Sequence, residues 1–182
     1  LGELGAVVEE VSIPLIADSA VISSALIMVD CAVVHRRGID EYLDQYDHNN
    51  QIRLLTGCIM PAQAHQKATR LREVMRQQVL DALEGVDVLV MPTSSIPASL
   101  IPTRSGVGSK QEVLDILSGR RSFTNPFNLA NVPALSVNCG FTSQDLPVGL
   151  QVIGKPFDEA TLFRVADAYE QATDWHTRRP PV

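Results

Sequence analysis

Cysteine is scarce in this sequence of 182 residues, and its three copies form no motif. Cys31, Cys58 and Cys139 leave an odd count without a CxxC pair. That excludes a disulfide framework as the basis of the fold and favours a reducing compartment, so we expect a cytoplasmic location. Buried free cysteines usually pack as small apolar residues, and we assign none of them a catalytic role.

Positive charge is also in short supply. The chain has 15 Lys and Arg against 21 Asp and Glu, a net charge of −6. This balance argues against a nucleic-acid partner, because gripping a phosphate backbone requires an excess of cations. Hydrophobic residues make up 45% and charged residues 20% of the chain, which excludes a disordered tail and predicts a single domain over 1–182.

Long apolar runs and a signal peptide are missing as well. The longest apolar stretch, Val21–Val34, is interrupted by two serines, an aspartate and a cysteine. We therefore expect it not to span a bilayer and expect no membrane partner. The chain begins at Leu1 without an initiator Met, from which we expect a piece of a longer polypeptide.

Common catalytic signatures are absent too, since the chain has no GxSxG, HExxH or GxxxxGK[ST] pattern. The four histidines lie far apart in sequence, and we expect no metal and no cofactor. Ser94 and Ser95 follow a predicted strand, where the sites of open α/β sheets tend to lie. A polar turn whose hydroxyls satisfy loop backbone groups is the simpler interpretation.

The hydrophobic periodicity that is present predicts an α/β fold. A stripe with the 3.6-residue period predicts a long helix over 62–83, and the apolar run 87–91 predicts a strand buried on both faces. Segments 133–139 and 147–153, separated by a turn-type cluster, predict a hairpin. The other expected elements are a strand over 5–11, a helix over 18–37 ended by Gly38, short helices and loop over 40–57, a loop over 92–109, a short helix over 110–119 and a final helix over 159–173 with Asp158 as its N-cap.

Several segments resemble the amidase signature family in the right order. The run NPFNLANVPALSVNCG at 125–140 is similar to the family pattern T-x-P-x-N-L-A-G-x-P-A-x-S-x-P-x-G. The segment 146–159 resembles the family's hairpin and the start of its C-terminal helix. DVLVMPT at 87–93, the segment 57–62 and the segment 4–11 resemble earlier family segments, so that the resemblance covers nearly the whole chain.

This resemblance implies the C-terminal part of a mixed-sheet α/β amidase fold, with helices packed on both sides of the sheet. Enzymes of the family hydrolyse an amide C–N bond with a serine nucleophile, a second serine in a cis peptide and a lysine base, all in a Gly/Ser-rich stretch of the N-terminal half. That stretch is not in this sequence. The resemblance therefore implies no catalytic residue here. It predicts a chain that supplies scaffold and a pocket wall for a small-molecule amide, and that is inactive without its N-terminal half.

Substrate binding is the role that the resemblance suggests for Arg72, Thr93 and Asn128. Arg72 follows the family segment at 57–62, on a helix that faces the site in related chains, where its guanidinium could bind a substrate carboxylate. An ion pair with Glu73 on the helix surface remains equally open. For Asn128, capping of loop backbone groups is favoured over lining the cavity.

Departures from the family pattern refine these expectations. Asn131 stands where the family usually has Gly, which predicts a positive φ that Asn tolerates. Asn138 replaces the usual Pro, and His65 a common Tyr. Arg121 lies roughly where the A subunits of tRNA-dependent glutamine amidotransferases carry an Asp used for substrate. A cation there would repel the positively charged amino group of glutamine and so weaken its binding. This difference favours a general amidase.

Two alternatives stay open beside that interpretation. One is the A subunit of a tRNA-dependent glutamine amidotransferase, and the other is a non-catalytic module that only assembles with a partner chain. In all three cases the truncated fold is expected to expose strand edges or apolar helix faces, and we expect self-association into a homo-oligomer.

Overall fold

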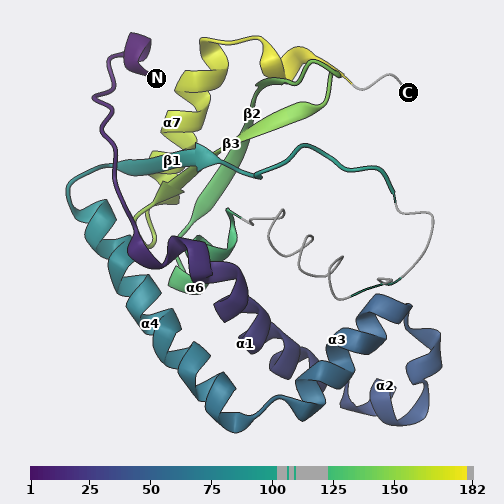
Figure 1. The fold of residues 1–182 in the computed structure, drawn as a ribbon. Helices are drawn as coiled ribbons and strands as arrows, with labels where there is room; N and C mark the ends of the chain where they lie inside the picture. The colour runs from purple at the N-terminus through teal and green to yellow at the C-terminus, as the bar shows by residue number, and fades with distance from the viewer. Residues whose placement is uncertain (102–105, 107–108, 110–122, 180–182) are drawn as a thin grey trace.

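The computed structural model describes residues 1–101, 106, 109 and 123–179 (Figure 1). The described chain contains both helices and strands, as expected for an α/β fold. The helices are α1 (Ser19–Val34), α2 (Arg36–Glu41), α3 (His48–Ile59), α4 (Ala62–Glu84), α6 (Asn125–Ala130) and α7 (Glu159–Gln171). The strands are β1 (Val88–Pro92), β2 (Ala134–Phe141) and β3 (Pro147–Gly154), and short 3-10 helices lie at Gly2–Leu4, Pro14–Asp18, Leu43–Gln45 and Trp175–Thr177.

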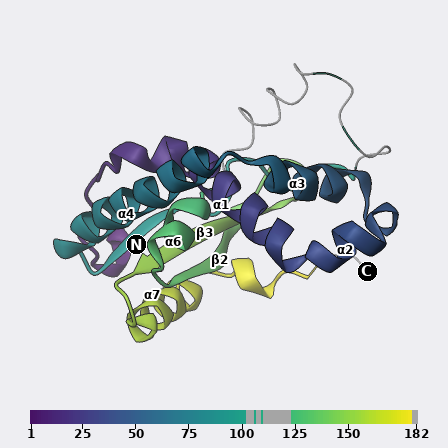
Figure 2. The same ribbon diagram turned by 90° about the horizontal axis from the view of Figure 1, so that it is seen from below.

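The three described strands form one antiparallel sheet in the order β1-β3-β2. Leu89 lies opposite Ile153, and Val90 lies opposite Val152. Because successive residues of a strand point to opposite faces, Leu89 and Ile153 meet the helices on one side of the sheet, and Val152 points to the other. Figure 2 shows α4 and α7 on opposite sides of the sheet, which confirms the expected layering.

The main core lies between the sheet and α4. The predicted helix over 62–83 is confirmed, and its stripe buries Met75, Val79 and Leu83 almost completely. These side chains pack with Phe127 of α6 and Ile153 of β3. Each large apolar side chain so buried contributes about 1.5–3 kcal/mol to stability. The hydrophobic period of one long helix thus determines where the sheet and α6 attach.

Three predictions made from the sequence are wrong. Residues 5–11 form no strand and are exposed, because no described strand pairs with them. The helix expected over 18–37 ends at Val34, and Gly38 lies buried inside α2, where a Cβ would overlap the Tyr46 hydroxyl. The strand β1 is an edge strand whose Val90 is 37% exposed, so the apolar run is not buried on both faces.

Helix α1 is strongly apolar. By length and composition, Pro14–Val34 is apolar enough to cross a membrane, with a mean hydropathy of 1.8. Its polar residues therefore do not exclude a span, contrary to the expectation. In the fold, α1 packs against α3 and α4, and a side chain at Gly57 of α3 would overlap the Met28 carbonyl of α1. Val21, Ile27, Val33 and Val34 remain more than half exposed on its outer surface.

The hairpin and the last helix are close to their predicted positions. β2 and β3 are joined by a turn over 142–146, and their pairing shifts register between Asn138 and Gly140. Asp158 occupies the N-cap position of α7, but its carboxylate accepts from the Thr161 hydroxyl at 2.9 Å rather than from a helix N–H. The helix expected over 110–119 and the residue Arg121 lie outside the described residues.

Candidate active-site wall

An open cavity of about 710 Å³ lies beyond the end of β1 and beside the hairpin. Its lining comes from residues 93–99 after β1, from Thr124 just ahead of α6, from 136–138 of β2 and from 147–149 of β3. Segments far apart in sequence thus meet at one end of the sheet. The cavity is the best candidate for a binding site in the described part of the chain.

Two hydroxyl groups of the cavity lining are linked by a hydrogen bond. Thr93 donates its backbone N–H to the Gly149 carbonyl at 2.8 Å, which extends the β1–β3 pairing by one bond. Its Oγ1 lies 2.6 Å from the Oγ of Ser136, and either hydroxyl can be the donor. A Cβ on Gly149 would lie 2.7 Å from Thr93 Oγ1 and 2.8 Å from Ser136 Oγ. The absence of a side chain at Gly149 is therefore what allows the two hydroxyls to meet.

One serine of the turn after β1 forms a hydrogen bond within that turn. The Ser94 hydroxyl donates to the Ile96 carbonyl at 2.7 Å, as in the polar-turn interpretation. Ser95 is exposed and lines the cavity. Activation of a serine requires a base that takes its proton. Among the described residues no Lys, His, Asp or Glu lines the cavity.

The segment leading into α6 is fixed by a buried side chain of β3. Gln151 is only 3% exposed, and its Nε2 donates to the Phe123 carbonyl at 3.1 Å. This bond places Thr124, the next residue, at the edge of the cavity. α6 then ends at Ala130, and the φ of 53° at its C-cap, Asn131, confirms the predicted positive φ.

Two arginines of α4 hold the carboxyl end of α6. Arg72 Nε donates to the Leu129 carbonyl at 3.1 Å, and Arg76 donates to the Ala130 carbonyl. The last carbonyls of a helix lack partners within the helix and carry partial negative charge, so two guanidinium groups satisfy them well. Arg72 does not line the cavity.

Of the three residues predicted to bind substrate, the structure brings only Thr93 to the cavity. Asn128 is exposed on α6, away from the cavity lining, and its carbonyl accepts from the Asn131 N–H at 3.3 Å. Substrate contacts by Arg72 and Asn128 therefore stay predictions, whereas their observed bonds stabilise α6.

Sequence reasoning missed three residues that shape this wall, namely Ser136, Gly149 and Gln151. Ser136 and Gln151 lie opposite each other in the hairpin register, which their spacing from the turn could have indicated. The contact of Gly149 with Thr93 depends on β1 pairing with β3. Pairing between strands that are distant in sequence leaves no local signal.

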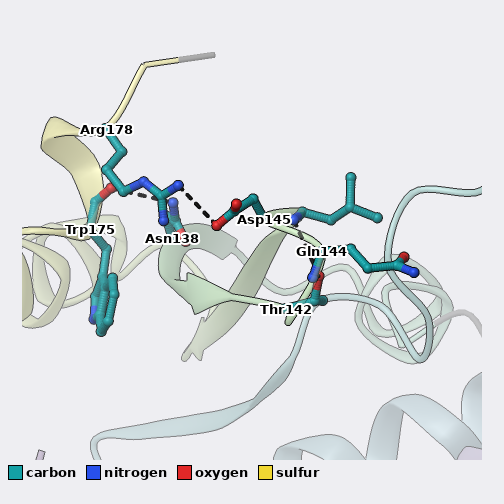
Figure 3. Close-up of polar contacts among 7 residues, drawn as sticks. Asn138, Thr142, Gln144, Asp145, Trp175 and Arg178 are labelled. Atoms are coloured by element: carbon teal, nitrogen blue, oxygen red, sulfur yellow. Dashed lines mark hydrogen bonds and ion pairs between the residues drawn. The ribbon is translucent and has the colours of Figure 1, made fainter. Parts of the chain in front are cut away.

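The C-terminal segment is attached to the outer part of the hairpin (Figure 3). The Arg178 guanidinium lies 3.9 Å from the centre of the Phe141 ring and 3.1 Å from an Asp145 carboxylate oxygen. Asn138 donates its Nδ2 to the Trp175 carbonyl at 3.4 Å. Because Asn138 also lines the cavity, this attachment supports one edge of the wall.

Burial alters the acid–base behaviour of Cys139 on β2 and of Tyr169 on α7. Desolvation raises the pKa of the Cys139 thiol above its ordinary value of 9.0. Desolvation also raises the pKa of Tyr169, with a smaller contribution from the charge of Cys139. The Cys139 thiol is therefore protonated at neutral pH and is a poor nucleophile. Among the described residues, no three His, Cys, Asp or Glu side chains lie close enough together to hold a metal ion.

Comparison with known proteins decides the family. The sequence pattern of the family described as Amidase matches residues 1–163. The chain belongs to the amidase family. This match confirms the resemblance that the segments at 87–93 and 125–159 suggested.

The relatives of this amidase-family chain are considerably longer than the chain itself. The A subunit of a glutamyl-tRNA(Gln) amidotransferase from Chloroflexus aggregans is 46% identical over 118 residues, which are 65% of this chain and 23% of that protein. The crystal structure of an amidase superimposes with a TM-score of 0.81 and 25% identity, over 95% of this chain and 39% of the other. A 6-aminohexanoate cyclic dimer hydrolase gives 0.82 at 21% identity, over 99% and 40%, and this likeness shows the fold.

Proposed function

We propose that this chain forms the C-terminal scaffold and one substrate-pocket wall of an enzyme that hydrolyses carbon–nitrogen amide bonds. The observation that carries the proposal is the open cavity at the end of β1. Its lining combines residues of the family segments at 87–93, 125–140 and 146–159 with residues 94–99 and Thr124. The small-molecule amide binds in this cavity, against Thr93 and the linked hydroxyl of Ser136.

The reactive groups come from polypeptide that corresponds to the rest of the family fold. The chain spans about two fifths of the solved amidase chain that it matches. A serine nucleophile needs a neighbouring base, and the described residues bring no base to the cavity. We therefore expect this chain alone to hydrolyse no amide, and no residue of it is assigned to catalysis, to a metal or to a cofactor.

The test is complementation with the polypeptide encoded upstream of Leu1. The purified chain, the upstream polypeptide and their mixture are assayed for ammonia release from small neutral amides. We expect release only from the mixture or from the continuous polypeptide. Release by the chain alone, lost in Ser94→Ala or Ser95→Ala, contradicts the proposal. Complete inactivity of the mixture favours the non-catalytic assembly module.

A second candidate function is the A subunit of a tRNA-dependent glutamine amidotransferase. The observation that favours it is the 46% identity with the corresponding protein of Chloroflexus aggregans. This function predicts co-purification with charged tRNA and a B-type subunit, and glutamine as the preferred amide donor. A general amidase predicts neither, and a pull-down with glutamine assays separates the two.

Self-association and location belong to the same proposal. Without the rest of the family fold, α1 exposes Val21, Val33 and Val34, and burial of apolar surface stabilises association by about 25 cal/mol per Å². We expect light scattering to show that the isolated chain forms homo-oligomers. We also expect the protein to lie in the cytoplasm and to have no nucleic-acid or membrane partner. Monodisperse monomer at high concentration contradicts the expected association.

A further inference from the structure

We propose that the substrate group held against this wall is uncharged, so that the enzyme prefers neutral amides to amides of equal size that carry a carboxylate. This inference rests on the proposed amidase function and names its substrate class. It follows from the chemistry of the cavity lining, from the hydrogen-bonding capacity of the linked hydroxyls and from the positions of the nearby arginines.

The described lining of the cavity contains no ionisable side chain that is charged at neutral pH. Its polar groups are hydroxyls and one amide, that of Asn138, and the remaining side chains are aliphatic. A charged group that leaves water for such a surface loses hydration without gaining a counter-ion. A neutral amide or hydroxyl can replace its hydrogen bonds to water with hydrogen bonds to these hydroxyl and amide groups.

The linked hydroxyls of Thr93 and Ser136 match a neutral polar group. The two hydroxyls carry two protons, and one of these is shared across the 2.6 Å contact. One O–H is left to donate, together with lone pairs that accept. An amide needs both a donor for its carbonyl and an acceptor for its N–H, and this pair offers both. A carboxylate accepts only, and one neutral donor satisfies few of its lone pairs.

Three arginines of the described residues that hold α6 and the hairpin are engaged outside the cavity. Arg72 and Arg76 hold the carboxyl end of α6. Arg178 lies over the Phe141 ring and pairs with Asp145. None of these three arginines lines the cavity, so none neutralises a substrate carboxylate there.

The experiment compares two amides of the same length in the full enzyme that contains this chain. Succinamide is neutral, and succinamate carries a carboxylate in place of its second amide. We expect the wild-type kcat/KM to be at least about tenfold higher for succinamide. Equal or better hydrolysis of succinamate overturns this inference and leaves the amidase function intact. Hydrolysis of neither compound overturns the amidase function and, with it, this inference.

Variants locate the discrimination at the hydroxyl pair. Ser136→Ala and Thr93→Val each remove one member, and we expect KM for succinamide to rise about three- to tenfold. KM for butyramide, which lacks the second polar group, is expected to change less than about twofold. The matched control is Ser143→Ala in the exposed turn of the hairpin, which should leave both KM values unchanged. Variants at Ser136 and Thr93 that behave like this control overturn the inference.

A charge introduced at the wall gives an independent readout. Ser136→Lys places a cation beside the cavity, and we expect it to raise kcat/KM for succinamate relative to succinamide. An unchanged ratio in a folded Ser136→Lys enzyme shows that the wall does not sense substrate charge, which overturns the inference. Should this variant not fold, the Ser136→Ala and Thr93→Val measurements decide.

Discussion

The two ends of β3 lie in different surroundings. From Gln151 to Gly154 every residue is buried, whereas from Pro147 to Leu150 the strand is exposed or half-exposed, and residues 147–149 line the cavity. The buried end is defined by apolar volume, with Ile153 packed against the helix layer. The open end is defined by close approach and hydrogen bonds, with Gly149 beneath Thr93 and Ser136. One strand thus serves as core at one end and as binding wall at the other.

The largest effect on stability is expected at the buried end. Ile153 is fully buried, and Ile153→Ala leaves a cavity that the surrounding helices cannot fill. We expect the free energy of unfolding to fall by about 2–5 kcal/mol, measured from urea denaturation midpoints. The control is Val148→Ala at the open end of the same strand, where the side chain is 36% exposed. A loss at Val148 as large as that at Ile153 would remove the distinction between the two ends.

The open end is expected to respond to added rather than removed volume. Gly149→Ala forces the new methyl group against the hydroxyls of Thr93 and Ser136. We expect a loss of about 1–3 kcal/mol in stability and a higher KM for neutral amides in the full enzyme. Gly85→Ala is the matched control, because a Cβ there has no neighbour within 4 Å and φ is −90°. Equal behaviour of the two variants would show that the wall is not tightly packed.

The sequence could predict the locally determined parts of this structure but not the pairing of distant strands. The 3.6-residue period of 62–83 predicts α4, and the turn cluster between two apolar runs predicts the hairpin, because both signals are local. The positive φ of Asn131 confirms the prediction drawn from the family resemblance, in which Gly usually stands at this position. The pairing of β1 with β3 is not local, so neither the edge position of β1 nor the contact below Thr93 could be predicted.

Removing the hydrogen bond between Arg72 of α4 and α6 is expected to have an intermediate effect on stability. Arg72→Ala leaves the Leu129 carbonyl of α6 without its partner, which costs about 1–3 kcal/mol for a bond to a charged group. The exposed Arg70 on the same helix supplies the control, and Arg70→Ala should cost less than about 0.5 kcal/mol. In the full enzyme, we expect Arg72→Ala to lower kcat and leave the preference between neutral and anionic amides unchanged. A selective loss of carboxylate-bearing substrates would instead support the predicted substrate contact of Arg72.

The smallest effect is expected from the thiol behind the cavity wall, and it appears only in alkaline solution. Burial holds the pKa of Cys139 above 9.0 in the folded protein, so the folded state binds this proton more tightly than the unfolded chain does. The resulting stability is fully present below about pH 9 and is lost as pH rises through the pKa of the folded state. Tyr169, whose pKa is also raised by burial, adds a further loss of stability as the pH rises above its ordinary pKa of 10.0.

Urea midpoints measured from pH 7 to pH 10 should therefore fall less steeply in Cys139→Ser than in the wild type. Cys58→Ser, at an exposed thiol, should leave the slope unchanged, and an equal slope in all three proteins would show that the back of the wall is open to water like its front.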